Sequence, residues 1–157
     1  MNEFQRREEL GREALKQLKK LYPNHFKYDL HFTTNVYECY DAYYFIKEDG
    51  SIKKRVWIEI KIRDVDYPDY LLEQKKIQAL NKKRDELFLN KDEVDFIYIN
   101  FTPTKTIIWN ITNVDTENTT QLYANKATSI SRKYKINKNV IMLKPSDGIV
   151  LDYKIDK

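Results

Sequence analysis

The fold of this chain is decided by residues 55–63, which read RVWIEIKIR. Along a β-strand the side chains point alternately to opposite faces, so every second residue of this stretch lies on the same side. One side is wholly apolar, and a slip of one residue would expose its four aliphatic side chains to water. The other side carries Trp57, Glu59 and Lys61. We therefore expect a buried strand that holds a carboxylate and an ammonium group side by side.

The composition predicts one globular domain over residues 1–157. The chain is 41% hydrophobic and 33% charged, a balance that excludes the disordered class. Its single cysteine, Cys39, excludes an internal disulfide and favours a reducing compartment. No apolar run suggests a signal peptide or a membrane span, so we expect no membrane partner and a cytoplasmic location in a bacterium, or in a host cell if phage-encoded. The net charge of +4 is compatible with a nucleic-acid partner.

The hydrophobic periodicity predicts helices interleaved with strands, which is typical of an α/β sandwich. Two helices are expected, over residues 3–22 and over residues 69–89, the second capped by Asp69. Residues 115–130 are ambiguous, with a short helix around residues 119–127 as one interpretation. The expected strands cover residues 25–34, 37–47, 55–63, 94–101, 105–111 and 140–143.

One loop decides which face of the sheet carries Asp41. Residues 48–50, Glu-Asp-Gly, give a hairpin signal between two expected strands. A two-residue turn would place Asp41 opposite Ile58, on the apolar side. A three-residue loop with its glycine left-handed would place Asp41 opposite Trp57, on the same face as Glu59 and within the ~7–8 Å of diagonal neighbours. We predict the three-residue loop or an equivalent bulge.

Two carboxylates held close together on a rigid sheet are suited to binding a divalent cation. Like charges repel, and a bound cation relieves that repulsion. Mg²⁺ prefers oxygen ligands and takes one or two carboxylates together with substrate phosphate and water. Asp41 and Glu59 would supply the carboxylates, and Lys61 beside them can orient the attacking water or stabilise charge on a phosphate. The alternative interpretation of Glu59 and Lys61 is a solvated, charged sheet face.

Asp41, seventeen intervening residues and then Glu59-Ile60-Lys61 resemble the signature of the PD-(D/E)xK nuclease superfamily. In that superfamily a helix precedes three antiparallel strands, the Asp lies on the second strand and the Glu-x-Lys on the third, and a further helix and strand follow. The resemblance implies an α/β fold with a restriction-endonuclease-like αβββαβ core, a mixed sheet of about five strands flanked by helices. The core would cover residues 3–111, and residues 112–157 would form a C-terminal extension. Tyr40 replaces the proline of the signature, a common variation.

The resemblance also implies a set of site residues. The metal ligands would be Asp41, Glu59, the carbonyl of Ile60, and Glu13 or Glu9 from the first helix. The catalytic residues would be Asp41, Glu59, Lys61 and Gln74. The cofactor would be Mg²⁺, with Mn²⁺ as a substitute, and Lys75 and Lys76 would hold the substrate backbone. Gln78 follows Gln74 where exonuclease-like branches have a tyrosine, so no subfamily is assigned.

The sequence thus predicts an Mg²⁺-dependent phosphodiesterase, a nuclease with DNA as the expected substrate. Homodimers are common in the superfamily. Two alternatives stay open: a catalytically inactive nucleic-acid-binding protein on the same fold, and a viral structural or accessory protein. Four tyrosines near Asp41 are interpreted as half-buried strand residues rather than base-stacking platforms. They are Tyr37, Tyr40, Tyr43 and Tyr44.

Overall fold

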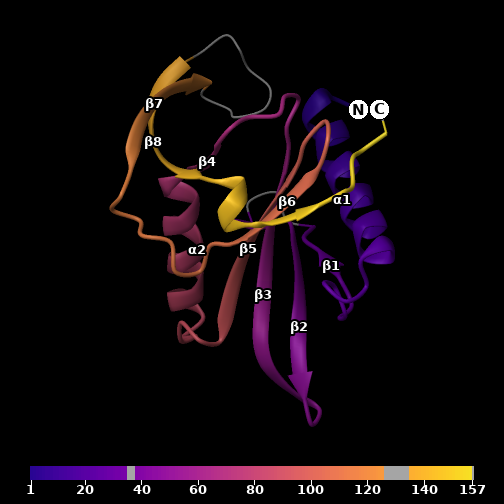
Figure 1. Ribbon diagram of the computed structural model, residues 1–157. Coiled ribbons are helices and arrows are strands. Elements are labelled where there is room, and N and C mark those ends of the chain that lie inside the picture. Colours follow the sequence, from indigo (N-terminus) through magenta and orange to yellow (C-terminus); the bar gives the residue numbers. More distant parts are fainter. Residues whose placement is uncertain (35–37, 126–134, 157) are drawn as a thin grey trace.

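The computed structural model describes residues 1–34, 38–125 and 135–156 (Figure 1). The elements in chain order are α1 (Glu3–Leu21), β1 (His31–Phe32), β2 (Ala42–Glu48), β3 (Ser51–Ile62), β4 (Tyr70–Glu73), α2 (Gln74–Glu86), β5 (Val94–Phe101), β6 (Thr106–Asn110), β7 (Thr120–Asn125), β8 (Lys135–Leu143), the 3₁₀ helix η1 (Pro145–Asp147) and β9 (Ile149–Leu151).

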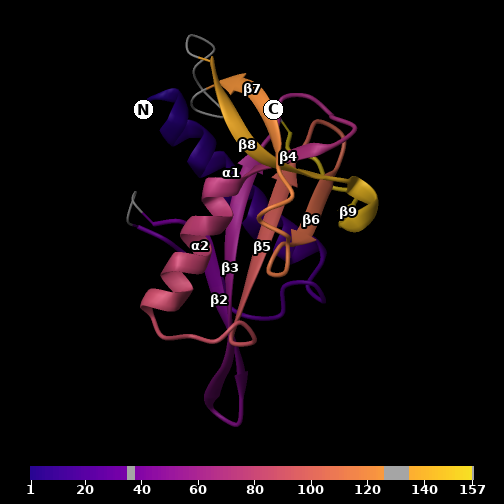
Figure 2. The same cartoon turned by 90° about the vertical axis from the view of Figure 1, so that its left-hand side faces the viewer.

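The main sheet has six strands in the order β1-β2-β3-β5-β6-β9. β3 and β5 are parallel and are connected through α2, while every other neighbouring pair is antiparallel. The two helices lie on opposite faces of this sheet (Figures 1 and 2). A second sheet, β4-β8-β7, holds three strands. The predicted α/β class and the αβββαβ order of elements are confirmed, with β4 inserted before α2 and six strands in place of about five.

β3 is the central element because it is covered on both faces. Val56 and Ile58 pack in one cluster of buried residues with Leu15 and Leu18 of α1. Trp57 packs in a second cluster that includes α2. Burying a side chain of this size stabilises the fold by about 1.5–3 kcal/mol. The two clusters therefore hold the register of β3, and Glu59 and Lys61 are fixed on the face that α2 covers.

The predicted start of the second helix is wrong. Residues 70–73 form β4, which pairs with residues 140–143 of β8, so α2 begins only at Gln74. Glu73 is its N-cap, and its carboxylate receives a short hydrogen bond, 2.5 Å long, from the buried ammonium group of Lys138. A pairing partner so far along the chain overrides the local helix signal.

Other expected boundaries also shift. The strand expected over residues 25–34 is reduced to β1, and the strand expected over residues 37–47 begins only at Ala42, with residues 35–37 outside the described part. Residues 120–125 form β7, which pairs with β8, so the short helix around residues 119–127 is wrong over the part that is described.

The β2–β3 hairpin closes with a two-residue turn, so the predicted three-residue loop is wrong. Glu48 pairs directly with Ser51. Asp49 and Gly50 both have positive φ, at 53° and 78°, as a type I′ turn requires.

The predicted alternative, an equivalent bulge, is present one step further along the hairpin. Lys47 pairs with Ile52, but Ile46 pairs with Lys54, so Lys53 is the extra residue on β3. The bulge shifts the pairing by one residue for the rest of the hairpin, so the side chains of β2 meet different partners from those that the turn alone would give. As a result Tyr43 lies opposite Trp57.

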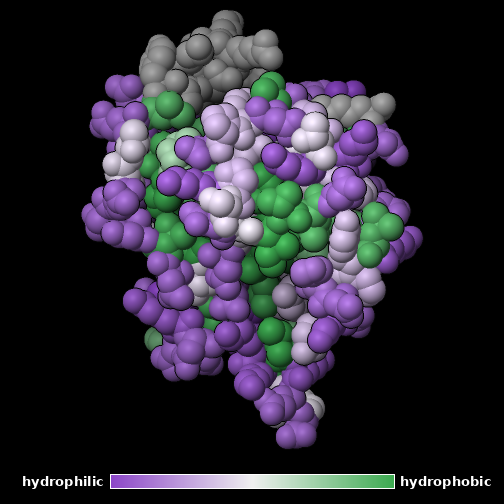
Figure 3. All heavy atoms as spheres, in the orientation of Figure 1, coloured by the Kyte–Doolittle hydropathy of each residue, from purple (hydrophilic) through white to green (hydrophobic). Residues whose placement is uncertain are grey.

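The hairpin tip extends beyond the rest of the sheet (Figure 1), because β5 joins β3 only at the pair Arg55–Val94. Its surface is hydrophilic, whereas hydrophobic atoms gather in the middle of the view in Figure 3, where Figure 1 draws β6 and β9. Two exposed residues of β9, Ile149 and Val150, belong to the apolar surface of the molecule. Within the described residues, neither helix has the length and apolar character needed to span a membrane.

Candidate active site

A cavity of about 210 Å³ lies at the end of β3, where α1, α2 and the segment before β2 approach it. Its floor is built from β3, and each of the other segments adds charged side chains. The lining residues are Phe4, Arg7, Glu8, Gly11 and Arg12 of α1, Glu38 and Asp41, residues 59–63, and Lys76 of α2.

Asp41 is held by hydrogen bonds on both sides of its backbone. Its N–H donates to the carbonyl of Ile58 (2.8 Å), and its carbonyl accepts the N–H of Thr33 (3.0 Å). Its Oδ2 accepts the N–H of Ile60 at 2.7 Å. The side chain thus takes the place of the backbone carbonyl that a longer β2 would offer to this N–H. The guanidinium of Arg12 donates to the carbonyl of Thr33 (2.7 Å), which ties this corner to α1.

The environment of Asp41 disfavours its charged form. Burial raises the pKa of the carboxyl first, and the negative charge of Glu59 raises it further. The hydrogen bond from Ile60 and the charges of Lys61 and Lys76 oppose these effects, and the pKa rises from 3.8 to about 7. The site therefore stores repulsion between two carboxylates that a bound cation would relieve.

Glu59 lies between two ammonium groups. Its side chain is only 6% exposed, and its Oε1 is 3.5 Å from Lys61 Nζ and 3.2 Å from Lys76 Nζ. Desolvation alone would lower the pKa of Lys61, but the charges of Glu59, Tyr98 and Asp41 outweigh it, so the pKa of Lys61 is raised. Lys61 therefore stays cationic at neutral pH.

Ile60 presents its backbone polar groups to the cavity edge. Alternate residues of a strand direct their N–H and C=O groups to the same neighbour, and Ile58 and Ile60 both face β2. Because β2 begins only at Ala42, its ladder stops at Ile58. The Ile60 carbonyl is thus available at the side of Asp41.

The structure brings a different glutamate of α1 to the cavity from the two expected. Glu13 is exposed and pairs with Lys16 at 2.9 Å, and Glu9 is exposed as well. Glu8 lines the cavity instead. The buried face of α1 includes Gly11, one turn after Glu8, where a Cβ would meet Ile60 Cγ2 at 3.1 Å. A glycine inside a helix often marks such a close approach, and this signal would have selected Glu8.

Of three expected residues at the start of α2, the structure brings only Lys76 to the cavity. The amide of Gln74 donates to the carbonyl of Thr116 at 2.7 Å, and Lys75 is exposed. The cause is β4: it delays the start of the helix and turns the side chain of Gln74 towards the segment before β7.

Three arginines at the cavity were not expected from the sequence. Arg7 donates to the carbonyl of Ile62 (2.7 Å), and Arg63 donates to Oδ1 of buried Asn100 (2.6 Å). Together with Arg12 they fix the backbone around the cavity and add positive charge to its rim. Basic residues on a helix, such as Arg7 and Arg12, or at the end of a strand, such as Arg63, carry no signal in the sequence that separates such roles from solubility.

The donor set fits a hard divalent cation. Over the described residues, no three histidine, cysteine or acidic side chains form a ready-made metal cluster. Two carboxylates and one backbone carbonyl are nevertheless a sufficient set of protein ligands for Mg²⁺, since the ion keeps several bound waters and takes further oxygen ligands from a substrate phosphate. Burial and the negative charge of Glu59 both raise the pKa of Asp41, and a cation between Asp41 and Glu59 would relieve both effects.

No protein-family model matches this sequence, and no curated protein matches it. Among solved structures, the fold is similar to that of Hjc, a Holliday junction resolvase from the hyperthermophilic archaeon Archaeoglobus fulgidus. The two chains are 13% identical with a TM-score of 0.43, and the match covers 83% of this chain and 93% of Hjc. A likeness of this strength assigns no activity or substrate to this chain.

Proposed function

We propose that this protein is a metal-dependent nuclease that hydrolyses phosphodiester bonds, with DNA as its substrate. One observation carries the proposal: two carboxylates, Asp41 and Glu59, and two ammonium groups, Lys61 and Lys76, meet in one cavity. Opposite charges placed this way suit a polyanionic substrate that needs both a cation and hydrogen-bond donors.

Mg²⁺, or Mn²⁺ in its place, would be held by Asp41, Glu59 and the carbonyl of Ile60. When bound, the ion supplies positive charge for the phosphate and lowers the pKa of a bound water. Glu8 faces the same cavity and can accept hydrogen bonds from waters in it.

Lys61 and Lys76 would contact the phosphate and the attacking water. Both lie within 3.5 Å of Glu59 Oε1, so the same carboxylate positions both ammonium groups. Lys61 comes from a rigid strand and Lys76 from a helix, so they approach the cavity from different sides. Charge that develops on the phosphate in the transition state would be stabilised by fixed donors of this kind.

A second candidate function follows from the same ion pairs. Lys61 and Lys76 neutralise Glu59 without a metal, which favours a protein on the same fold that binds nucleic acid and does not cut it. The two candidates differ in one respect: binding alone is sensitive to salt but indifferent to divalent ions.

Cleavage assays separate these candidates. Plasmid DNA, single-stranded DNA and RNA are incubated with the protein in Mg²⁺, in Mn²⁺ and in excess chelator. We expect cleavage that stops with chelator and is lost in Asp41→Asn and in Glu59→Gln, while Glu13→Gln, which changes an exposed carboxylate outside the cavity, keeps wild-type activity. Equal cleavage by all four proteins would contradict the assignment, and metal-indifferent binding without cleavage would support the second candidate. Light scattering of the same samples shows whether the protein forms a homodimer, as is common in the superfamily that the sequence resembles.

A further inference from the structure

A group of aromatic side chains leads away from the cavity along β2. We call it the aromatic strip: His31, Tyr40, Tyr43 and Phe45. His31 stacks on Tyr43 with ring centroids 5.1 Å apart, and Phe45 meets Tyr43 edge-on at 5.6 Å. Tyr40 is 6.1 Å from Tyr43 and stacks on Trp57 at 4.9 Å, which anchors the strip to the buried core. His31 is exposed, and the other three members are partly exposed.

The strip and the cavity lie on one line. Asp41 directly precedes β2, and Tyr43 and Phe45 lie on one face of that strand about 6.8 Å apart, so the two rings lead away from the Asp41 end of the strand. Tyr43 is opposite Trp57 and Phe45 is opposite Arg55, which places the strip on the face that α2 partly covers.

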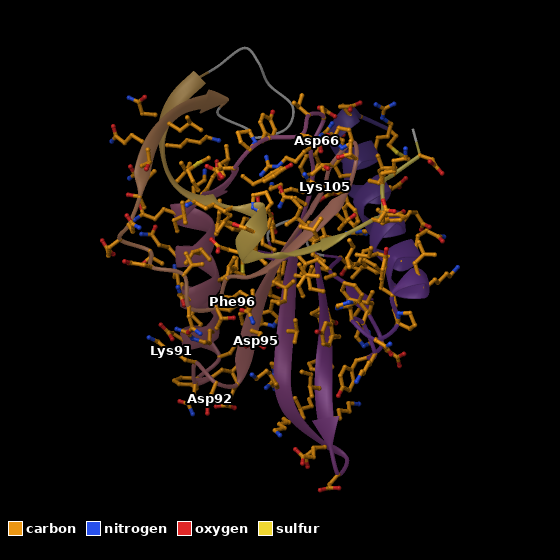
Figure 4. All side chains as sticks on the ribbon, viewed as in Figure 1. Asp66, Lys91, Asp92, Asp95, Phe96 and Lys105 are labelled. Atoms are coloured by element: carbon orange, nitrogen blue, oxygen red, sulfur yellow. The ribbon has the colours of Figure 1, made fainter. Side chains whose placement is uncertain are left out.

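Positive charge borders the strip. Arg55 shares the face with Phe45, and no described carboxylate forms an ion pair with its guanidinium. Lys83 of α2 lies 3.6 Å from Glu38, a carboxylate two residues before Tyr40 that also lines the cavity. Lys54, one residue before Arg55, is turned to the opposite face, where it pairs with Asp95 at 3.5 Å. Figure 4 shows Asp95 next to Phe96, whose ring stacks on Trp57.

We propose that the aromatic strip binds unpaired bases, so that the substrate carries a single-stranded segment next to the phosphodiester that is cut. The part of this inference that places the cut rests on the proposed function, whereas the binding of unpaired bases does not depend on it. The rings pack on one another at 5.1–6.1 Å, and the faces and edges that stay partly exposed are the ones that can contact bases. Bases that are paired and stacked in a duplex do not present their faces, whereas unpaired bases can lay a face on an exposed ring.

The chemistry of the strip favours nucleic acid over a peptide. Aromatic faces beside a basic groove form the usual platform for single strands, because every base has a face that can stack and every nucleotide has a phosphate for a cation. Tyr40 of the strip is next in the chain to Asp41, which lines the cavity, so a strand stacked on the strip would run towards Asp41. The tyrosines are thus half-buried residues of the sheet and also the floor of a binding surface.

Binding is measured in excess chelator, so that the result does not depend on whether the protein cleaves its substrate. Two fluorescent oligonucleotides are compared: a thymidine strand, and an abasic strand with the same number of phosphates. We expect the thymidine strand to bind about 10²-fold more tightly. Tyr43→Leu and Phe45→Leu should each remove about tenfold of that affinity and leave abasic binding unchanged. Arg55→Gln should weaken both strands equally.

Tyr44→Leu is the matched control. Tyr44 is the same kind of residue on the same strand, but it faces α1 and stacks on Tyr28 at 5.8 Å. The variant should bind both strands like the wild type, and circular dichroism shows whether each variant is folded. Equal affinity for the two strands, no binding to either, or an equal loss in Tyr44→Leu and Phe45→Leu would each overturn the proposal. If the wild type shows base-dependent binding but does not cleave DNA, the proposed nuclease function is refuted and the proposal for the aromatic strip is not.

Discussion

Asp41→Asn is expected to stabilise the metal-free protein at neutral pH while it abolishes the proposed activity. The carboxyl of Asp41 is buried and faces Glu59, and these two causes raise its pKa to about 7. An asparagine keeps an oxygen that can accept the N–H of Ile60, but it removes the charge that Glu59 repels. Under the proposed function, Asp41 would serve a bound cation at the expense of stability.

The size of the effect follows from proton linkage. Below a pH of about 4 the carboxyl is protonated in both the folded and the unfolded chain, so it has no effect on the free energy of unfolding. Between about 4 and 7 the unfolded chain has lost a proton that the folded chain keeps, so stability falls as the pH rises. Each pH unit in this window costs about 1.4 kcal/mol, which gives about 4 kcal/mol over the whole window. Above pH 7 the difference is constant.

Urea unfolding from pH 4 to pH 8 in chelator measures this difference. We expect the free energy of unfolding of the wild type to fall, relative to Asp41→Asn, by up to about 4 kcal/mol across that range. Glu59→Gln should give an intermediate slope, because burial still acts on Asp41. Added Mg²⁺ should stabilise the wild type at pH 8, by about 2.7 kcal/mol at roughly 100 times its dissociation constant, and should leave Asp41→Asn unchanged. Parallel pH profiles for the wild type and Asp41→Asn would refute the reasoning.

Three further outcomes are expected. In a plasmid-nicking time course, Lys76→Ala should be about 10²-fold slower than the wild type and Lys75→Ala should be near it; equal rates in the two variants would remove Lys76 from the site. Glu8→Gln should weaken Mg²⁺ binding about tenfold by calorimetry, whereas Glu9→Gln should not; this is the test of which glutamate of α1 belongs to the cavity. Gly11→Val should lower both the free energy of unfolding, by about 1–3 kcal/mol, and the cleavage rate, because a side chain there pushes α1 away from β3; an unchanged unfolding curve would show that the contact is not close.

The central strand could be predicted from the sequence because its signal is local. The alternation of residues 55–63 places Trp57, Glu59 and Lys61 on one face, and the observed burial agrees with it. The order of the elements follows from the same kind of pattern. By contrast, β4 owes its conformation to a strand about 70 residues further along the chain, and no local rule shows that pairing.

The placement of the site residues on helices was less predictable, because it depends on the phase of each helix. A shift of one residue turns a side chain by about 100°. The sequence predicted Glu13 or Glu9 and missed Glu8, because the choice depends on the position of the buried face, which Gly11 marks more precisely than the long apolar residues of α1 do. In α2, the delayed start moved Gln74 out of the cavity and left Lys76 in it.

The hairpin shows how two sound local arguments can disagree and both be satisfied. The dipeptide at residues 49–50 favours a two-residue turn, and the structure has one. The apolar faces of β2 and β3 require Ala42 to lie opposite Ile58, beside α1, which a two-residue turn alone cannot give. The bulge at Lys53 absorbs the difference of one residue. The register at the cavity is therefore set by the core and not by the turn, so changes in the turn should leave Asp41 beside Glu59.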